Sequence, residues 1–406
     1  MTQFAAIASP FSCVQIANGG VAWNGQDDSR NDNQRKIVCF FMDGGLSQID
    51  SFDPKPDAPA RIRGEFGAIN TSAKGVYFSE IWPRLATVAN RMTVIRSIHH
   101  RHNEHGFALR CMRTLQNNAG RQTPSLGSVV QWQSQSAMPV YVGLNDALDY
   151  SGALGANFRP FSLQGPVGKR ITAGRSNGNG SEINARLNLL SQLETASTVA
   201  QRDIRSQTLI QQQERIGEIL RSPVFQRMLN ISSVSAETKT RYGATSIGEQ
   251  VLLARNAVNE GMKFTIVNIP GWDMHTNLFA QCRQKVAAVD SAIAAFVEDL
   301  DACGQLESTI VLVMTEFGRS PVIEGTGRGH CPQAMSVLAM GGPVPRGHVL
   351  GDTGPNGNES IDIRHEPDDL LASLYKWLQL EWEIMLPGEN ARLNTAGTVI
   401  SELEPG

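Results

Sequence analysis

Short, unbroken runs of apolar residues are the feature that most limits the folds open to this chain. The clearest runs lie in residues 36–42, 264–269 and 309–314. A strand that is buried on both faces of a parallel sheet is apolar throughout, whereas a half-exposed strand alternates. These runs therefore predict interior strands of a parallel sheet, and further strands are expected over 91–96 and 334–340.

The segments between these runs carry the spacing of helices. The best example lies in 286–300, where apolar residues recur at intervals of three and four and Gly304 follows. Other helices are expected over about 82–89, 106–115, 247–258 and 368–378. Because strands alternate with helices, we expect an α/β fold with a mostly parallel sheet and helices on both faces.

The predicted domain organisation is a single α/β domain over residues 36–390. A loop-rich and helical insertion is expected at about 116–245, where the chain first becomes rich in Gly, Ser, Asn and Pro and then polar with helical spacing. Residues 1–35 are expected to form a flexible tail or the remnant of a signal peptide, since no basic region precedes their weakly apolar part. Residues 391–406 are expected to form a C-terminal tail.

Composition argues against several classes of function. The net charge of −3 gives no basic field that would recruit nucleic acid. No run approaches the roughly 18 apolar residues of a membrane span, so none is predicted. Ser47 is not surrounded by the GxSxG pattern of an α/β-hydrolase, and no GxGxxG motif for a dinucleotide follows the first strand.

Polar residues that follow the predicted strands indicate where chemistry would occur. In open α/β sheets, ligands bind beyond the carboxyl ends of the strands. Six of the eight histidines lie just after predicted strands or a short loop later, together with acidic residues. Carboxylates and imidazoles at such positions hold divalent cations. Each residue alone has a simpler interpretation, because an acid there often caps a helix and a loop histidine is often only solvated.

Four blocks of sequence resemble those of a known bacterial family, the domain of unknown function family 1501. They occur in the family's order and cover about residues 36–385. The blocks are Gly44-Gly-Leu-Ser-Gln-Ile-Asp-Ser-Phe-Asp-Pro-Lys-Pro56, Gly271-Trp-Asp-Met-His275, Glu316-Phe-Gly-Arg319 and Gly327-Arg-Gly-His330.

That family resembles a distant branch of the alkaline phosphatase and sulfatase superfamily. The resemblance implies a three-layer α/β sandwich of the alkaline phosphatase type. It also implies metal ligands at Asp43, Asp273, His275, Glu316 and His330, with one or two divalent ions such as Zn, Mn or Ca. The fourth strand of that superfamily usually ends in Asp-His-Gly, and here Glu316 keeps the acid while Phe317 replaces the histidine.

The position of the superfamily's nucleophile also departs from the pattern. Sulfatases carry a modified Cys or Ser nine residues ahead of a Thr-Gly pair. Here Thr114 is followed by Leu115, and His105 stands nine residues before Thr114. His105 is therefore expected to be a metal ligand, a general base or a phosphorylated nucleophile.

The resemblance implies a metal-dependent hydrolase of phosphate or sulfate esters, acting on a small-molecule or glycan ester. His105 and Arg319 are the expected catalytic residues, with Arg319 neutralising the oxyanion of the substrate. An ion pair with a neighbouring acid is the alternative for Arg319. The alternative function is an inactive scaffold that binds an anion, a glycan or a protein partner. A periplasmic or exported location is expected rather than a cytoplasmic one, because relatives in the family often carry export signals.

Overall fold

A central sheet organises the computed structural model, which describes residues 35–136, 138–145, 150–163, 217–386, 392–393 and 396–404. Within these residues the sheet has eight strands. In spatial order they are β12 (His348–Leu350), β4 (Met92–Ile95), β11 (Val337–Met340), β8 (Thr309–Thr315), β1 (Lys36–Asp43), β7 (Phe264–Pro270), β5 (Tyr141–Leu144) and β6 (Phe161–Leu163). The predicted tail at 1–35, apart from Arg35, and the predicted insertion between residues 164 and 216 lie outside the described residues.

The prediction of a mostly parallel sheet is confirmed. β1 runs parallel to both β7 and β8, β5 runs parallel to β6 and β7, and β12 runs parallel to β4. β11 is the exception, because it lies antiparallel between β4 and β8. The apolar run at 334–340 predicted this strand but carried no information on its direction.

Strand β1 is buried on both faces, as its unbroken apolar run predicts. Phe40 packs edge-on against Phe296, with ring centroids 5.2 Å apart. The strand divides the core into two clusters, with Val38, Phe40 and Met42 on one side and Ile37, Cys39 and Phe41 on the other. Such a strand cannot move without disturbing both layers of helices, so it gives the residues that follow it a firm support.

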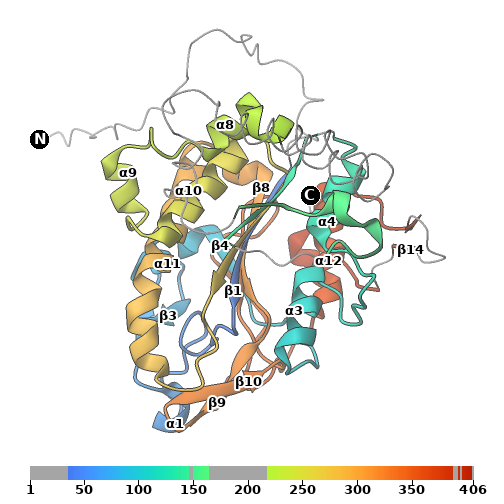
Figure 1. The fold of residues 1–406 in the computed structure, drawn as a ribbon. Coiled ribbons are helices and arrows are strands. Elements are labelled where there is room, and N and C mark those ends of the chain that lie inside the picture. Colours follow the sequence, from blue (N-terminus) through green and yellow to red (C-terminus); the bar gives the residue numbers. More distant parts are fainter. Residues whose placement is uncertain are drawn as a thin grey trace, which may run out of the picture.

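Helices cover both faces of the sheet (Figure 1). One face carries α2 (Pro83–Thr87), α10 (Ser246–Asn259) and α11 (Leu278–Ala302), and the other carries α3 (His105–Thr114), α4 (Leu126–Gln133) and α12 (Pro367–Leu378). The smaller elements are α1 (Ala60–Arg63), α8 (Pro223–Leu229), α9 (Ala236–Arg241) and the antiparallel pairs β2 (Ala68–Asn70) with β3 (Tyr77–Ser79) and β13 (Ile384–Met385) with β14 (Arg392–Leu393).

A hairpin of β9 (Gly318–Glu324) and β10 (Gly327–Cys331) follows β8 directly and lies at the lower end of the molecule in Figure 1. His330 on β10 stands opposite Arg319 on β9 in its register. The sequence analysis predicted no strand over residues 318–331, so this hairpin was missed. The segment does not alternate between apolar and polar residues, so its sequence pattern does not indicate strands.

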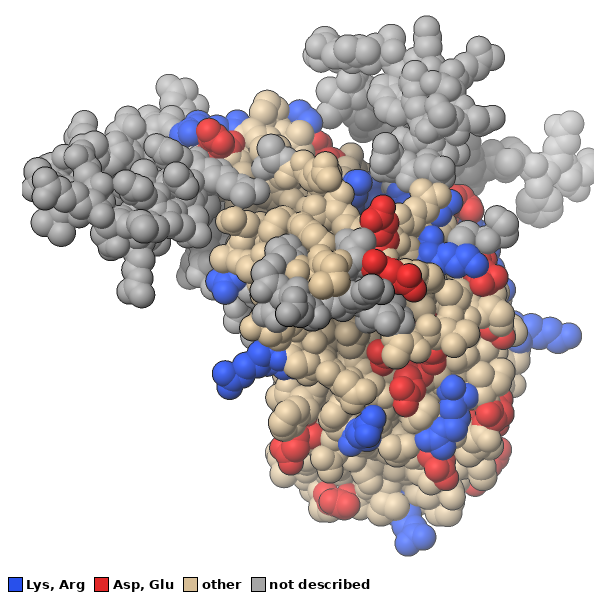
Figure 2. All heavy atoms as spheres, turned by 90° about the vertical axis from the view of Figure 1, so that its right-hand side faces the viewer, with Lys and Arg blue, Asp and Glu red and all other residues tan. Residues whose placement is uncertain are grey.

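The surface carries charges of both signs. On the face seen in Figure 2, acidic and basic side chains are interspersed over the described residues. Among these residues, no helix has the combination of length and apolar character that crossing a membrane requires.

Candidate metal centre

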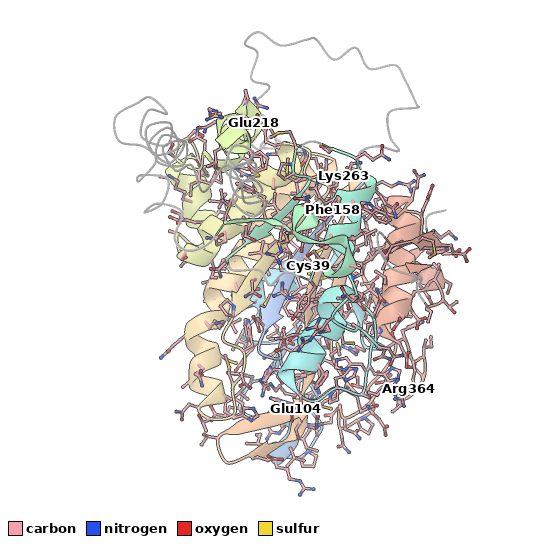
Figure 3. The ribbon with its side chains drawn as sticks, turned by 45° about the vertical axis from the view of Figure 1, so that its right-hand side comes forward. Cys39, Glu104, Phe158, Glu218, Lys263 and Arg364 are labelled. Atoms are coloured by element: carbon pink, nitrogen blue, oxygen red, sulfur yellow. The ribbon has the colours of Figure 1, made fainter. Side chains whose placement is uncertain are left out.

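Three residues from distant parts of the chain meet beside the β9–β10 hairpin. The ligand atoms of His105, Asp273 and His330 all lie within 4.8 Å of one another. His105 begins α3, Asp273 follows β7, and His330 lies on β10. Figure 3 labels Glu104, the residue before His105, at the lower end of the molecule where the hairpin also lies. We call these three residues the metal group.

One ring nitrogen of His105 is hydrogen-bonded to Glu316, and the other makes no hydrogen bond among the described residues. Its Nδ1 lies 3.0 Å from Glu316 Oε1, and a carboxylate only accepts, so Nδ1 carries the proton. This hydrogen bond to the Glu316 carboxylate also raises the pKa of His105. Its Nε2 is buried, makes no hydrogen bond and lies 3.4 Å from Asp273 Oδ2. In the neutral tautomer, the Nε2 lone pair is therefore available to a cation.

His330 is oriented in the same way by a backbone carbonyl. Its Nδ1 donates to the carbonyl oxygen of Asn103 over 2.7 Å. Burial lowers the pKa of His330, which favours the neutral ring with a lone pair on Nε2. That Nε2 lies 3.4 Å from Asp273 Oδ1 and 3.0 Å from His275 Nε2. Two imidazole nitrogens at this separation must share either a proton or a cation.

Asp273 is ionised and shared between neighbours. Its Oδ1 accepts from Arg319 Nη2 over 2.7 Å and lies 3.0 Å from His275 Nε2. Partial burial by itself raises the pKa of Asp273, but the hydrogen bond and charge of Arg319 outweigh it and bring the pKa to about 2. The metal group therefore contains a carboxylate at any ordinary pH, with His275 beside it.

Arg319 is inside the protein and only 1% exposed. Its guanidinium donates to the carbonyl oxygens of Gly44, Gly45, Trp272 and Arg328, as well as to Asp273. These bonds occupy the guanidinium, which leaves little of it for a substrate. The geometry corresponds to the ion pair that the sequence left as the alternative for Arg319.

Glu316 and Asp43, two of the expected ligands, are not part of the metal group. Glu316 is fully buried, and its Oε1 accepts from the backbone N–H of Gly44 over 2.8 Å as well as from His105. It thus acts on the group through His105. Asp43 Oδ2 accepts from Asn268 Nδ2 over 3.2 Å. The structure therefore brings Asp273, His275 and His330 together with His105 and holds the other two acids behind or beside them.

Two glycines allow the backbone segments of the site to approach each other. Gly44 has φ +121°, and a Cβ there would clash with the backbone nitrogen of Asp273. Gly327 passes so close to the backbone of His275 that a Cβ would overlap it. Gly44 thus combines a positive φ with a close approach to the chain at 272–273.

Phe317 forms an apolar wall at the position where the superfamily pattern has a histidine. It is fully buried, and its ring stacks on His330 with centroids 4.2 Å apart and lies 5.0 Å from the ring of His105. Phe317 therefore fixes the planes of two imidazoles without supplying a ligand. The sequence showed the replacement but gave no indication of this packing.

Several residues that support the site were missed by sequence reasoning. His100 is buried, its Nε2 donates to the carbonyl oxygen of Glu316 over 2.6 Å, and its Nδ1 accepts from the backbone of His102. Burial lowers the pKa of His100 to about 4, so the ring is neutral. Arg328 is fully buried and pairs with Asp50 over 2.7 Å. Both residue types usually indicate surface or ligand positions, so residue type alone did not reveal these roles.

The donor set fits a divalent cation. It combines a carboxylate with two imidazoles whose outer N–H groups are fixed by Glu316 and by a carbonyl, and one of the inner nitrogens is buried without a partner. Nitrogen and carboxylate ligands with such support are typical of zinc and other transition metals. Calcium takes six to eight oxygen ligands and fits this set less well.

Comparison with known proteins gives one family and several distant structures. A model of the family described as "Protein of unknown function (DUF1501)" matches residues 34–403. None of the curated proteins matches the sequence.

The solved structures to which the chain is similar include a mutant of TAB5 alkaline phosphatase with Mg bound in its M3 site. The identity is 10%, over 85% of this chain and 98% of that chain, with a TM-score of 0.40. PsFucS1 sulfatase from Pseudoalteromonas sp. is 12% identical, over 93% and 77% of the two chains, with a TM-score of 0.40. Phosphonate monoester hydrolase SpPMH from Silicibacter pomeroyi is 11% identical, over 90% and 76%, with a TM-score of 0.38. At these values the chemistry of this chain must be argued from its own residues.

Proposed function

We propose that this chain, which belongs to the DUF1501 family, is a metal-dependent hydrolase of phosphate or sulfate esters. The observation that carries the proposal is the convergence of His105, Asp273 and His330, with the buried Nε2 of His105 left unpaired inside the group. A buried nitrogen that makes no hydrogen bond is unfavourable. A cation bound between its lone pair and the Asp273 carboxylate, whose Oδ2 lies 3.4 Å away, would satisfy both groups.

The metal group supports one ion. The guanidinium of Arg319 already lies 2.7 Å from Asp273 Oδ1, where a second cation bound by this carboxylate would compete with it. Phe317 supplies no ligand atom, and Asp43 is held by Asn268. The second acid and the histidine that a two-ion site would need are therefore engaged elsewhere or missing. We assign the ion to His105, Asp273 and His330, with His275 as a fourth donor.

The protein residues prepare the site for ester hydrolysis. A divalent ion bound there would supply Lewis-acid chemistry, which polarises an ester oxygen and activates water near neutral pH. Glu316 and the carbonyl of Asn103 hold the two imidazoles in the tautomer that binds a cation. His275, which lies beside the metal group, is 50% exposed, so we expect the ester to approach from its side. Because His105 lies among the ligands, we assign it to metal binding rather than to nucleophilic attack.

A second candidate function is a catalytically inactive scaffold of the same fold that binds an anion, a glycan or a protein partner. The observation that favours it is that the guanidinium of Arg319 already donates hydrogen bonds to backbone carbonyls and to Asp273. That arrangement leaves no exposed guanidinium in the group to neutralise the charge of an ester.

The proposal is tested by metal analysis and hydrolysis assays on the purified chain and a His330→Ala variant. We expect about one zinc or manganese ion per chain, hydrolysis of aryl phosphates or sulfates, and a loss of metal affinity of at least about 100-fold in the variant. His348→Ala is the matched control, because His348 is exposed on the edge strand β12. A chain that binds no ion refutes the metal site. A chain that binds one ion without turnover favours the scaffold.

A further inference from the structure

Arg113 is a buried cation that the metal centre does not use. It lies on α3 and is 7% exposed. Its Nη2 donates to Asn268 Oδ1, and its guanidinium carbon lies 4.0 Å from the centroid of the Phe41 ring. Its Nε and Nη1 are buried and have no hydrogen-bond partner among the described residues. Unpaired buried donors on a charged group are unfavourable, so this side chain lacks a partner that its environment demands.

Within the described part of the chain, no acid forms an ion pair with Arg113, and Asn268 stands between its guanidinium and Asp43. The nearby Cys39 thiol does not supply a negative charge, because burial raises its pKa to about 12. Tyr150 is also neutral, since burial raises the pKa of its phenol. The buried guanidinium thus lacks a counter-charge among these groups.

A small cavity lies against this side chain. Its volume is about 20 Å³, which exceeds the roughly 10–15 Å³ that one water molecule requires. Figure 3 labels Cys39, one of the lining residues, near the centre of the molecule. The polar lining consists of Arg113, Ser125, Tyr141 and Tyr150, and the remaining wall is made of apolar side chains and Cys39.

We propose that this cavity binds a small monoatomic anion of the size of chloride, held by Arg113. The guanidinium has only hydrogen-bond donors, so a species that fits must accept hydrogen bonds. A halide accepts from one of the two unpaired N–H groups, Nε or Nη1, and also balances the charge. A water molecule would satisfy the same N–H group but not the charge. Larger anions such as phosphate exceed the volume of the cavity.

The test measures thermal unfolding of the full chain in sodium gluconate and in sodium chloride at constant ionic strength. Gluconate is too large for the cavity and serves as the reference anion. We expect the midpoint of unfolding to rise by about 2 °C with chloride and to saturate, and bromide to act in the same way. In Arg113→Met the rise disappears. The matched control is Arg110→Gln, which removes the same charge from the same helix at a side chain that is only half-buried, and there the rise remains.

Crystals of the unchanged chain soaked in bromide give a second measurement that needs no variant. We expect an anomalous bromine peak within hydrogen-bond distance of Arg113. Equal unfolding midpoints in chloride and gluconate overturn the proposal, and so does a chloride effect that persists in Arg113→Met. A cavity that holds only water in the soaked crystals overturns it as well. None of these measurements depends on hydrolase activity, so the anion site stands or falls apart from the metal centre.

Discussion

Glu316 is predicted to control metal binding without touching the ion. In a Glu316→Gln variant the amide oxygen takes the place of Oε1 and still accepts from the Gly44 backbone and from His105 Nδ1. The amide nitrogen then lies beside Thr315 Oγ1, which accepts from it and still donates to the carbonyl of Met42. The shape and the hydrogen bonds survive, while the negative charge behind His105 is lost.

The expected loss follows from the role of that charge. A carboxylate on the far nitrogen of a histidine ligand makes the near nitrogen a stronger donor. Removal of such a partner typically weakens metal binding by about 10- to 100-fold, which corresponds to about 1.4 to 2.8 kcal/mol. The free energy of unfolding of the metal-free protein is expected to change by less, because the buried hydrogen bonds persist.

The assay is a competition titration of zinc against a chromophoric chelator at pH 8, with urea unfolding of the metal-free chain as the measure of folding. Glu298→Gln is the matched control. Glu298 lies on α11, away from the metal group, and the variant removes its carboxylate from an ion pair with Arg84 on α2. If Glu316→Gln binds zinc as tightly as the unchanged chain, the action of Glu316 through His105 is refuted.

Two further predictions concern stability, the first away from the site and the second at it. Burial raises the pKa of Asp290, which accepts from the backbone of Leu85, to about 6. The folded state then holds this proton more tightly than the unfolded state, so stability falls as pH rises from about 4 to 6. Relative to Asp290→Asn, urea unfolding should show a loss of up to about 3 kcal/mol in that window, and parallel curves would contradict it. Gly44→Ala should cost at least about 2 kcal/mol and weaken zinc binding, since its Cβ meets the Asp273 backbone. Gly75→Ala, also at positive φ but in open space, is the control, and an equal cost in both variants would exclude the clash.

The fold was largely predictable because its signals are local. The unbroken apolar run of β1 predicted burial on both faces, and the regular spacing in α11 predicted the long helix. The direction of β11 was not predictable, since an apolar run has no direction and its neighbours are remote in sequence. The hairpin of β9 and β10 was missed because Arg319 and Arg328 are buried in it, and charge usually indicates the surface.

The candidate site was predictable in its residue types but not in its geometry. Histidines and acids at strand ends indicated which residues gather, and Asp273, His275 and His330 do meet. Which acid points at the group depends on backbone angles at single positions. Asp43 turns to Asn268 just before Gly44 adopts φ +121°, and such a rotation leaves no trace in residue spacing.

The metal group joins segments that are far apart along the chain, at the start of α3, after β7 and on β10. We expect these segments to meet only after the strands between them have paired in the sheet. An ion that bridges them would therefore stabilise the native state and not the partly folded states that precede it. Such an ion delays the opening of the native state and leaves the speed of folding nearly unchanged.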